Sequence, residues 1–353
     1  METKRQKTAA LWKACFDDTD EYIQFYFDRK YRDENTLLHE ENGQAIAALQ
    51  MLPYPMNWAG TTLRASYISG ACTLPEARNR GIMTRLLAEA FLTMARRSID
   101  LTFLIPAEPW LYGYYGKTGY APVFEYTPET FTPAVPPPTT ATLDIPAAYS
   151  DTLANSCYPY FDREMQKRPD SIQHPFDDFS TVLRDLYASG GRLLVAKSKE
   201  DSSGLTGLAF ALPEENHVRI SELLGNTPEI RAQLLHAASR LGNGKPVTCK
   251  LPAQQGKSEK RGMARIIQAE KMLARFAACH PQADFTLQLT DTLLPANNGY
   301  YTVVRGNCCK HINTEKKASY HMDIATLTQA LLGGLPENPT FPLRHPYLSL
   351  MLD

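Results

Sequence analysis

The segment that most constrains the fold of this chain runs from Ser69 to Thr84 and continues into a helix. A stretch of small and apolar residues ends at Thr73, a turn with Pro75 follows, and Arg78-Asn79-Arg80-Gly81 opens the next element. Beyond Gly81 apolar residues recur at helical spacing as far as Met94. The segment therefore predicts a strand, a tight turn and an amphipathic helix, which is a connection of an α/β domain.

This turn has the features of an anion-binding site. The backbone amides in the first turn of a helix have no intrahelical partner and lie at the positive end of its dipole. Such an N-terminus suits a pyrophosphate, and a glycine at position 81 lets phosphates approach the backbone closely. Arg78 and Arg80 can add charge-assisted hydrogen bonds. The simpler alternative is that Gly81 only relieves a tight strand-to-helix turn, with two exposed arginines nearby.

Length and composition limit the classes of protein that remain. At about 150 residues per domain, 353 residues suggest two or three domains. The chain is 43% hydrophobic and 21% charged, as in a globular protein and unlike a disordered one. Its net charge of -1 argues against a strongly basic surface for nucleic acid or anionic membrane. We therefore expect no nucleic-acid partner.

Several other features are expected to be absent. No apolar run approaches the ~18 residues of a membrane span, and the N-terminal residues do not resemble a secretory signal. The seven cysteines are scattered without a C-x-x-C pair, and the eight histidines show no H-E-x-x-H spacing. We expect a cytoplasmic protein without a membrane span and without a metal site.

Two polar or proline-rich stretches indicate domain boundaries. Residues 128–146 hold six prolines and are interpreted as a semi-rigid linker, and residues 252–262 as a second linker or a long loop. Three segments result: 1–127, 147–251 and 263–353.

The first segment predicts a regular succession of elements. An aromatic-rich helical region covers roughly 7–32, and strands at 36–40 and 44–49 flank Asn42-Gly43, a strong hairpin turn signal. Further strands are expected at 63–73 and 101–105, on either side of the long helix.

Two motifs resemble those of one enzyme superfamily. Arg78 to Met83 resembles the pyrophosphate loop Q/R-x-x-G-x-G/A of the GNAT acetyltransferases, with Met83 departing from Gly/Ala at the last position. Tyr115-Gly116-Lys117-Thr118-Gly119-Tyr120 resembles the Y-x-K-x-G-F/Y element of the same superfamily. Both motifs occur in the expected order.

The resemblance implies acetyl-CoA as co-substrate and direct attack by an amine. The strand through Ala71, Cys72 and Thr73 would pair with the pantetheine arm. The phosphates would meet the loop and its amides, formed by Arg78, Asn79, Arg80, Gly81, Ile82, Met83 and Thr84. Tyr115 would protonate the leaving thiolate. Tyr112 and Tyr114 are alternative proton donors, and the simpler interpretation of Tyr115 is a core aromatic residue with a structural role only. Cys72 is expected to line the pantetheine rather than to act as nucleophile.

The whole chain resembles the enhanced intracellular survival (Eis) branch of this superfamily. The resemblance implies an α+β protein with tandem GNAT-like domains (mixed central sheets flanked by helices) and a C-terminal sterol-carrier-protein-like α/β domain. The middle segment has a strand at 218–224 and a helix beginning at Thr227-Pro228, without an R-x-x-G loop, so it should not bind CoA. The last segment predicts strands and helices at 263–267, 268–277, 285–289, 300–304 and 324–332.

The same branch supplies an unusual base. There the C-terminal carboxylate reaches the active site and accepts the amine proton, which corresponds to Asp353 here. A tail that only packs on its own domain is the alternative. The acceptor, a primary amine of a small molecule or peptide, would meet Phe25, Tyr26 and Asp28, although each of these could equally be a core residue.

Two other classes of function are left open by the sequence. One is a catalytically weak protein that binds acyl-CoA or a lipid through its C-terminal domain. The other is a scaffold that acts mainly as a homo-oligomer.

Overall fold

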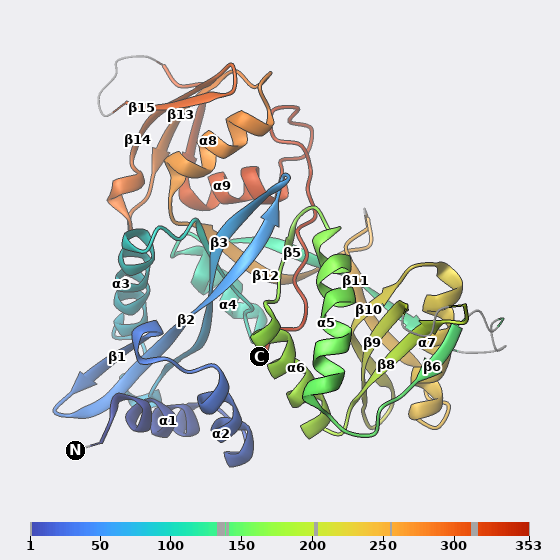
Figure 1. Cartoon of the computed structure of the whole chain (residues 1–353). Coiled ribbons are helices and arrows are strands. Elements are labelled where there is room, and N and C mark those ends of the chain that lie inside the picture. The colour runs from blue at the N-terminus through green and yellow to red at the C-terminus, as the bar shows by residue number, and fades with distance from the viewer. Residues whose placement is uncertain are drawn as a thin grey trace. The chain divides into compact units, whose positions relative to one another are not determined.

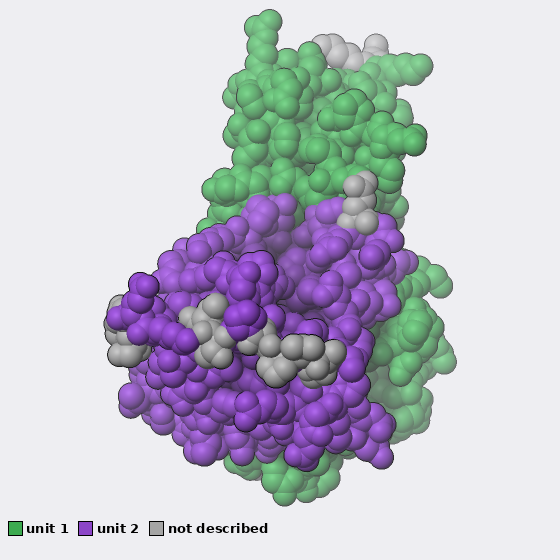
Figure 2. Space-filling view, turned by 90° about the vertical axis from the view of Figure 1, so that its right-hand side faces the viewer, with its two compact units in different colours: residues 1–123, 262–344 green, residues 124–261, 345–353 purple. Residues whose placement is uncertain are grey.

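The computed structural model describes residues 2–132, 138, 141–200, 204–254, 256–311 and 317–352. The chain forms two compact units, coloured separately in Figure 2. Unit 1 comprises Met1–Val123 and Gly262–Arg344, and unit 2 comprises Phe124–Arg261 and His345–Asp353. The chain passes from one unit to the other inside two strands, β5 (Ala121–Phe131) and β12 (Glu259–Ile266).

The N-terminal part of unit 1 is a sheet covered by helices (Figure 1). Its elements are α1 (Lys4–Cys15), α2 (Asp20–Arg29), β1 (Thr36–Glu41), β2 (Gln44–Trp58), β3 (Thr61–Thr73), α3 (Ile82–Arg96), β4 (Leu101–Leu104) and α4 (Pro109–Gly116), with short 3₁₀ turns at Asp33–Asn35 and Pro75–Ala77. Strands β1, β2 and β3 are antiparallel, β4 is parallel to β3, and β12 is antiparallel to β4.

Several predicted elements are confirmed in this part. Asn42 and Gly43 both have positive φ angles, 51° and 82°, as a tight hairpin turn requires. The long helix is α3, and its apolar stripe is buried on the sheet, with Leu87, Ala90 and Phe91 at 0% exposure. Burying a leucine or phenylalanine side chain is worth about 1.5–3 kcal/mol, so this stripe fixes α3 against the sheet.

The aromatic region at 7–32 differs from the expectation because it forms two helices. Helix α1 ends at Cys15, and α2 starts after Thr19, whose side chain accepts a hydrogen bond from the Tyr22 amide at 3.2 Å. In the connection, Trp12 Nε1 donates to Asp18 Oδ2 at 2.7 Å. The apolar pattern continues across the break, which is why periodicity alone did not indicate it.

The C-terminal part of unit 1 is a smaller α/β layer. Its sheet has the order β15-β14-β13-β16. The elements are α8 (Ala269–Cys279), β13 (Phe285–Thr290), β14 (Gly299–Val304), β15 (Asn307–His311), β16 (Tyr320–Asp323) and α9 (Ile324–Thr328). A 3₁₀ turn at Pro295–Asn297 lies between β13 and β14, and a π-helical turn at Gln329–Gly333 follows α9. The helix expected at 268–277 and the strands expected at 285–289 and 300–304 are confirmed within two residues at each end. The strand expected at 263–267 is β12, which begins four residues earlier, and the helix expected at 324–332 is α-helical only to Thr328 and continues as the π-helical turn.

Unit 2 repeats the connectivity of the N-terminal part. Its elements are β6 (Ala141–Asp144), α5 (Asp151–Gln166), β7 (Ser171–Ile172), α6 (Phe176–Ala188), β8 (Arg192–Ser198), β9 (Leu205–Pro213), β10 (Val218–Gly225), α7 (Pro228–Leu241) and β11 (Val247–Pro252). Two helices, an antiparallel β8-β9-β10 meander, a helix and a strand parallel to β10 follow one another, as in α1-α2-β1-β2-β3-α3-β4. The third meander strand carries an extra residue in both, because the register shifts near Gly70 in β3 and near Ser221 in β10. The predicted α/β class is therefore observed in both units.

The stretches interpreted as linkers are partly strands. Strand β5 extends to Phe131 and pairs with β11, while β6 starts at Ala141. Residues 133–137 and 139–140 lie outside the described part of the chain. In the second stretch, β11 ends at Pro252 and β12 begins at Glu259.

No helix in the described part of the chain is both long and apolar enough to span a lipid bilayer.

Candidate active site

The N-terminus of α3 presents unpaired backbone amides. Its first flanking residue, Gly81, has a φ of 71°, and Asn79 two residues earlier has a φ of 62°. No side chain caps this helix, and no group in the described residues accepts a hydrogen bond from the amides of residues 79–84. This geometry is the one that binds an anion at a helix N-terminus.

Three arginines surround these amides. Arg78 Nε donates to the Thr73 carbonyl oxygen at 3.2 Å, and Arg80 Nη2 forms an ion pair with Glu41 Oε1 at 2.7 Å. Arg85, one turn into α3, donates from Nη1 to the Arg80 carbonyl oxygen at 3.1 Å. The hydrogen bonds from Arg80 and His39 hold the pKa of Glu41 below its ordinary value.

Two of these residues were not found by sequence reasoning. Arg85 could have been, because a residue in the first turn of a helix necessarily lies near its N-terminus. Glu41 could not, since it comes from the β1–β2 hairpin and meets Arg80 only in the folded chain.

The edge of β3 near this turn is open toward β4. The two strands pair over Ala65–Tyr67 and Leu101–Phe103. Farther along, Cys72 and Thr73 pair with β2 on their other side, and no strand in the described residues pairs with Ala71–Thr73 on the β4 side. An extended ligand backbone such as pantetheine could add there as a further strand.

A glycine is required where β3 bends before this edge. Gly70 has a φ of 59°, and a Cβ built on it would lie 2.3 Å from Cζ3 of Trp12. Any side chain at position 70 would displace the Trp12 ring, so the bulge and the packing of α1 depend on each other.

Tyr115 lies at the inner side of α4. Its side chain is 8% exposed, and its ring contacts those of Tyr114 and Tyr120 at centroid distances of 5.3 and 5.8 Å. Burial, followed by the neighbouring Tyr114 and Cys72, raises the pKa of Tyr115 well above its ordinary range. The protonated phenol therefore stands beside the strand expected to bind pantetheine.

The two alternative tyrosines are less enclosed. The Tyr114 hydroxyl lies 3.4 Å from Thr84 Oγ1, at the phosphate turn. Tyr112 is half-buried and packs against the same apolar core.

Cys72 is buried and contacts Cys15 of α1. The hydrogen bond with Cys15, together with burial, raises the pKa of the Cys72 thiol and keeps it protonated. A nucleophilic cysteine needs the thiolate form. The environment of Cys72 thus favours the lining role over the nucleophilic one.

The three residues expected to face the acceptor have different surroundings on α2. Phe25 is half-buried, whereas Tyr26 is 1% exposed and its hydroxyl lies 2.7 Å from Ser69 Oγ. Asp28 is exposed, and hydrogen bonds from Gln24 and Arg5 hold its pKa below the ordinary value.

The expected base, Asp353, lies outside the described residues. The residues that precede it are anchored in unit 2: the Tyr347 amide donates to the Asp170 carbonyl oxygen at 2.7 Å, and Ser349 Oγ donates to Glu222 Oε2 at 2.6 Å. The Ser349 carbonyl oxygen is an acceptor only, so His174 Nε2, 3.0 Å away, carries the proton between them.

The corresponding helix of unit 2 does not offer the same anion site. Thr227 caps α7, with its side chain accepting from the Ile230 amide at 3.3 Å, and Pro228 has no amide hydrogen to offer. The segment without an R-x-x-G loop thus also has a helix N-terminus with fewer free amides.

Among the described residues no group of three or more histidine, cysteine, aspartate or glutamate side chains could hold a metal ion.

Comparison with known families and structures agrees with this geometry. Residues 1–123 match the family described as acetyltransferase (GNAT) domain, and residues 269–336 match the sterol carrier protein domain. A comparison with curated proteins gives no match.

Several solved structures share the fold over almost the whole chain. A GCN5-related N-acetyltransferase from Anabaena variabilis is 17% identical, with a TM-score of 0.74 and coverage of 97% of this chain and 96% of that one. A probable N-acyltransferase from Enterococcus faecalis is 15% identical, with a TM-score of 0.73 and coverage of 94% and 88%. Eis1 from Mycobacterium abscessus is 16% identical, with a TM-score of 0.71 and coverage of 95% and 89%.

The fold and the matching domains define an acyltransferase with an N-terminal GNAT domain and a C-terminal sterol carrier protein domain. The chain shares its fold with Eis1 over 95% of its length. The superfamily and the enzyme class indicated by the two sequence motifs are confirmed.

Proposed function

We propose that this protein is an N-acetyltransferase that moves an acetyl group from acetyl-CoA to a primary amine of a small molecule or peptide. The observation that carries the proposal is the unpaired amide cluster at the N-terminus of α3, beside a buried, protonated Tyr115. The CoA pyrophosphate would bind at these amides, the thioester would lie near Tyr115, and the pantetheine arm between them would follow β3. The protein would act in the cytoplasm, to which its seven free cysteines are suited.

The chemistry is direct acyl transfer. The neutral amine nitrogen attacks the thioester carbonyl carbon, and the carbon–sulfur bond breaks. Tyr115 gives its hydroxyl proton to the departing thiolate, and the amine proton passes to a base. General acid help of this kind is typically worth ~10²–10⁴-fold.

The proposed base is a carboxylate of Asp353. The anchoring of Tyr347 and Ser349 supports this role, because a terminal segment must be fixed if its end is to act in catalysis. Attaching a few residues after Asp353 removes the main-chain carboxylate and leaves the side chain. We expect lower turnover, while the same residues attached before Met1 serve as the control.

For the acceptor side we propose the surface of α2. Phe25 would offer apolar contact, and the exposed carboxylate of Asp28 would attract a cationic amine in place of its present partner Arg5. Tyr26 is buried on the same helix. For CoA we propose Ala71, Cys72 and Thr73 along the arm, and residues 78–84 at the phosphates.

The main alternative is a protein that binds acyl-CoA or a lipid without turnover, which the sterol carrier domain favours. Release of CoA thiol from acetyl-CoA, measured with a panel of primary amines, separates the two. Amine-dependent release supports the enzyme, whereas CoA binding without release for any amine would support the binding protein.

A further inference from the structure

Arg265 of β12 is a buried cation within unit 1. Its side chain has 0% exposure, and its guanidinium carbon lies 4.1 Å from the ring centroid of Phe91 in α3. Nη2 donates to Asp291 Oδ1 at 2.6 Å, and Nη1 donates to the Ile266 carbonyl oxygen at 3.0 Å. A charge in such a place needs every one of its partners, because water does not reach it.

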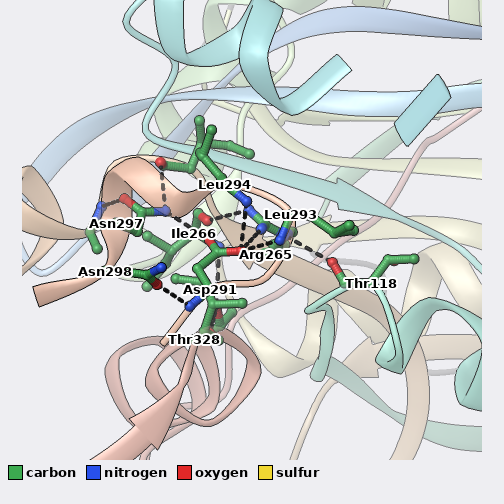
Figure 3. A network of polar contacts seen from close by, with 12 residues as sticks. Thr118, Arg265, Ile266, Asp291, Leu293, Leu294, Asn297, Asn298 and Thr328 are labelled. Carbon is green, nitrogen blue, oxygen red and sulfur yellow. Dashed lines mark hydrogen bonds and ion pairs between the residues drawn. The ribbon is translucent and has the colours of Figure 1, made fainter. Parts of the chain in front are cut away.

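The third guanidinium nitrogen of Arg265 donates a hydrogen bond to a residue of the acetyltransferase domain. Nε donates to the Thr118 carbonyl oxygen at 2.9 Å (Figure 3). Thr118 in turn holds Tyr115: its amide and its Oγ1 donate to the Tyr115 carbonyl oxygen at 2.9 and 2.8 Å. Arg265 is thus two hydrogen bonds away from the tyrosine at the end of α4.

The next residue shows how closely this turn is packed. Gly119 has a φ of 89°, and a Cβ built on it would lie 2.9 Å from Arg265 Nε and 2.6 Å from Ile324 Cγ2. Ile324 begins α9 in the C-terminal part of unit 1, and Arg265 lies in β12, the strand that pairs with β4. The turn after Tyr115 therefore has no room to shift toward them.

Asp291 is itself fixed by several donors. Oδ1 also accepts from the Leu294 amide at 3.0 Å, and Oδ2 accepts from Asn297 Nδ2 at 2.9 Å. The amide of Asp291 donates to the Asn298 side chain (Figure 3). The carboxylate is thus held by the loop between β13 and β14 of the sterol carrier domain.

We propose that Arg265, held by Asp291, is a positioning residue for acetyl transfer, through which the sterol carrier domain fixes the Thr118–Gly119 turn and hence Tyr115. This inference rests on the proposed role of Tyr115 as general acid. A buried ion pair is often replaceable by apolar residues without loss of stability, so stability alone does not account for it. A cation with one donor directed at a specific carbonyl in the catalytic turn does serve positioning.

The test combines Arg265→Lys with Tyr115→Phe in the full chain. Lysine keeps the charge beside Asp291 but lacks the guanidinium fork that reaches Thr118, Ile266 and Asp291 together. A misplacement of about 1 Å can cost ~10²-fold in rate, and we expect Arg265→Lys to lower kcat ~10–100-fold. The KM for acetyl-CoA should stay within about twofold, because the α3 turn is not in the network. In the Tyr115→Phe background, Arg265→Lys should add no further loss of kcat.

Two further variants separate an effect on positioning from an effect on folding. Val303→Ala, a fully buried change in β14 of the same domain, should weaken folding and leave the kcat of the folded enzyme unchanged. If Arg265→Lys does not fold, Thr118→Val removes the Oγ1 bond to Tyr115 from the other side. It should lower kcat severalfold.

Three results would overturn the inference. The first is an unchanged kcat in Arg265→Lys. The second is that Arg265→Lys lowers kcat as much in the Tyr115→Phe background as in the wild type. The third is that Val303→Ala lowers kcat as much as Arg265→Lys does. Tyr115→Phe alone reports on the proposed function, because a wild-type kcat there removes the acid role whatever Arg265→Lys does.

Discussion

Arg168 and Glu222 form a two-point ion pair inside unit 2, with Nη1 2.8 Å from Oε2 and Nη2 2.7 Å from Oε1. The Glu222 side chain is 1% exposed, and Ser349 of the C-terminal tail donates to the same carboxylate. The pair therefore connects the turn after α5, β10 and the tail within one unit. Burial opposes ionisation of Glu222, but Arg168 and Ser349 outweigh it and hold its pKa below the ordinary value.

This pair makes the stability of unit 2 depend on acid pH. A carboxyl group whose pKa is lowered by folding contributes stability above its unfolded pKa of about 4.3, and the contribution is lost as the pH falls through the folded pKa. Glu222→Gln should cost about 3–5 kcal/mol at pH 7, since it leaves a buried arginine unpaired. Urea unfolding between pH 7 and pH 3 should show this difference from the wild type shrinking. Asp144→Asn, which breaks the exposed pair with Lys197, should cost less than about 1 kcal/mol throughout. A gap that does not change with pH would refute the assignment.

In the proposed CoA complex, Glu41 would compete with the phosphates for Arg80, with which it forms an ion pair. Arg80 and Glu41 are 51% and 34% exposed, so solvent and salt screen the pair and Arg80 can exchange this partner. Glu41→Gln frees the arginine and removes a negative charge near the phosphates, so the Kd for CoA should fall ~2–5-fold at low salt and less at high salt. Titration calorimetry measures this, with Glu40→Gln as the matched control, since Glu40 pairs with Lys7. Equal effects of both variants would count against a specific role of Arg80.

Gly81 has a left-handed backbone conformation and lies where we propose that the CoA phosphates bind. An alanine there meets no close atom, as its Cβ would lie 3.6 Å from Arg85 Nη1, but a φ of 71° costs a side chain about 1–2 kcal/mol. Its methyl group would also stand at the amides that meet the pyrophosphate, so CoA should bind ~10-fold or more weakly in Gly81→Ala. Gly190→Ala has the same strain, at a φ of 84° and with no atom within 4 Å, far from these amides in sequence and in the other unit. Gly190→Ala should therefore lower the stability of the protein and leave its affinity for CoA unchanged. Weaker CoA binding in both Gly81→Ala and Gly190→Ala would indicate a general effect of backbone strain.

Elements set by local chemistry could be predicted from the sequence. Asn42-Gly43 determines the hairpin because both residues accept positive φ, and Thr227-Pro228 starts α7 because threonine caps and proline fits the first turn. The uncapped N-terminus of α3 at Gly81 is likewise set by local sequence. The end of α1 at Cys15 was missed, although Thr19 was available as a cap signal.

Features that depend on distant residues could not be predicted. The sequence indicates only that Arg265 is a charged residue in a strand. The fold shows that it is buried and donates hydrogen bonds to Thr118 and Asp291. The same holds for Glu41 beside Arg80 and for Ser349 on Glu222. In each case one partner comes from an element that the sequence separates from the other by tens of residues.

We propose Tyr115 as the general acid of the acetyl transfer, and this role carries the mechanism. Single-turnover rates with saturating acetyl-CoA and an accepted amine test it directly in Tyr115→Phe, with Tyr114→Phe as the matched control one residue away. We predict a loss of ~10²–10⁴-fold for Tyr115→Phe, with a CoA affinity near that of the wild type, and a near-normal rate for Tyr114→Phe. A wild-type rate in Tyr115→Phe, or a loss that falls on Tyr114→Phe instead, would contradict the account.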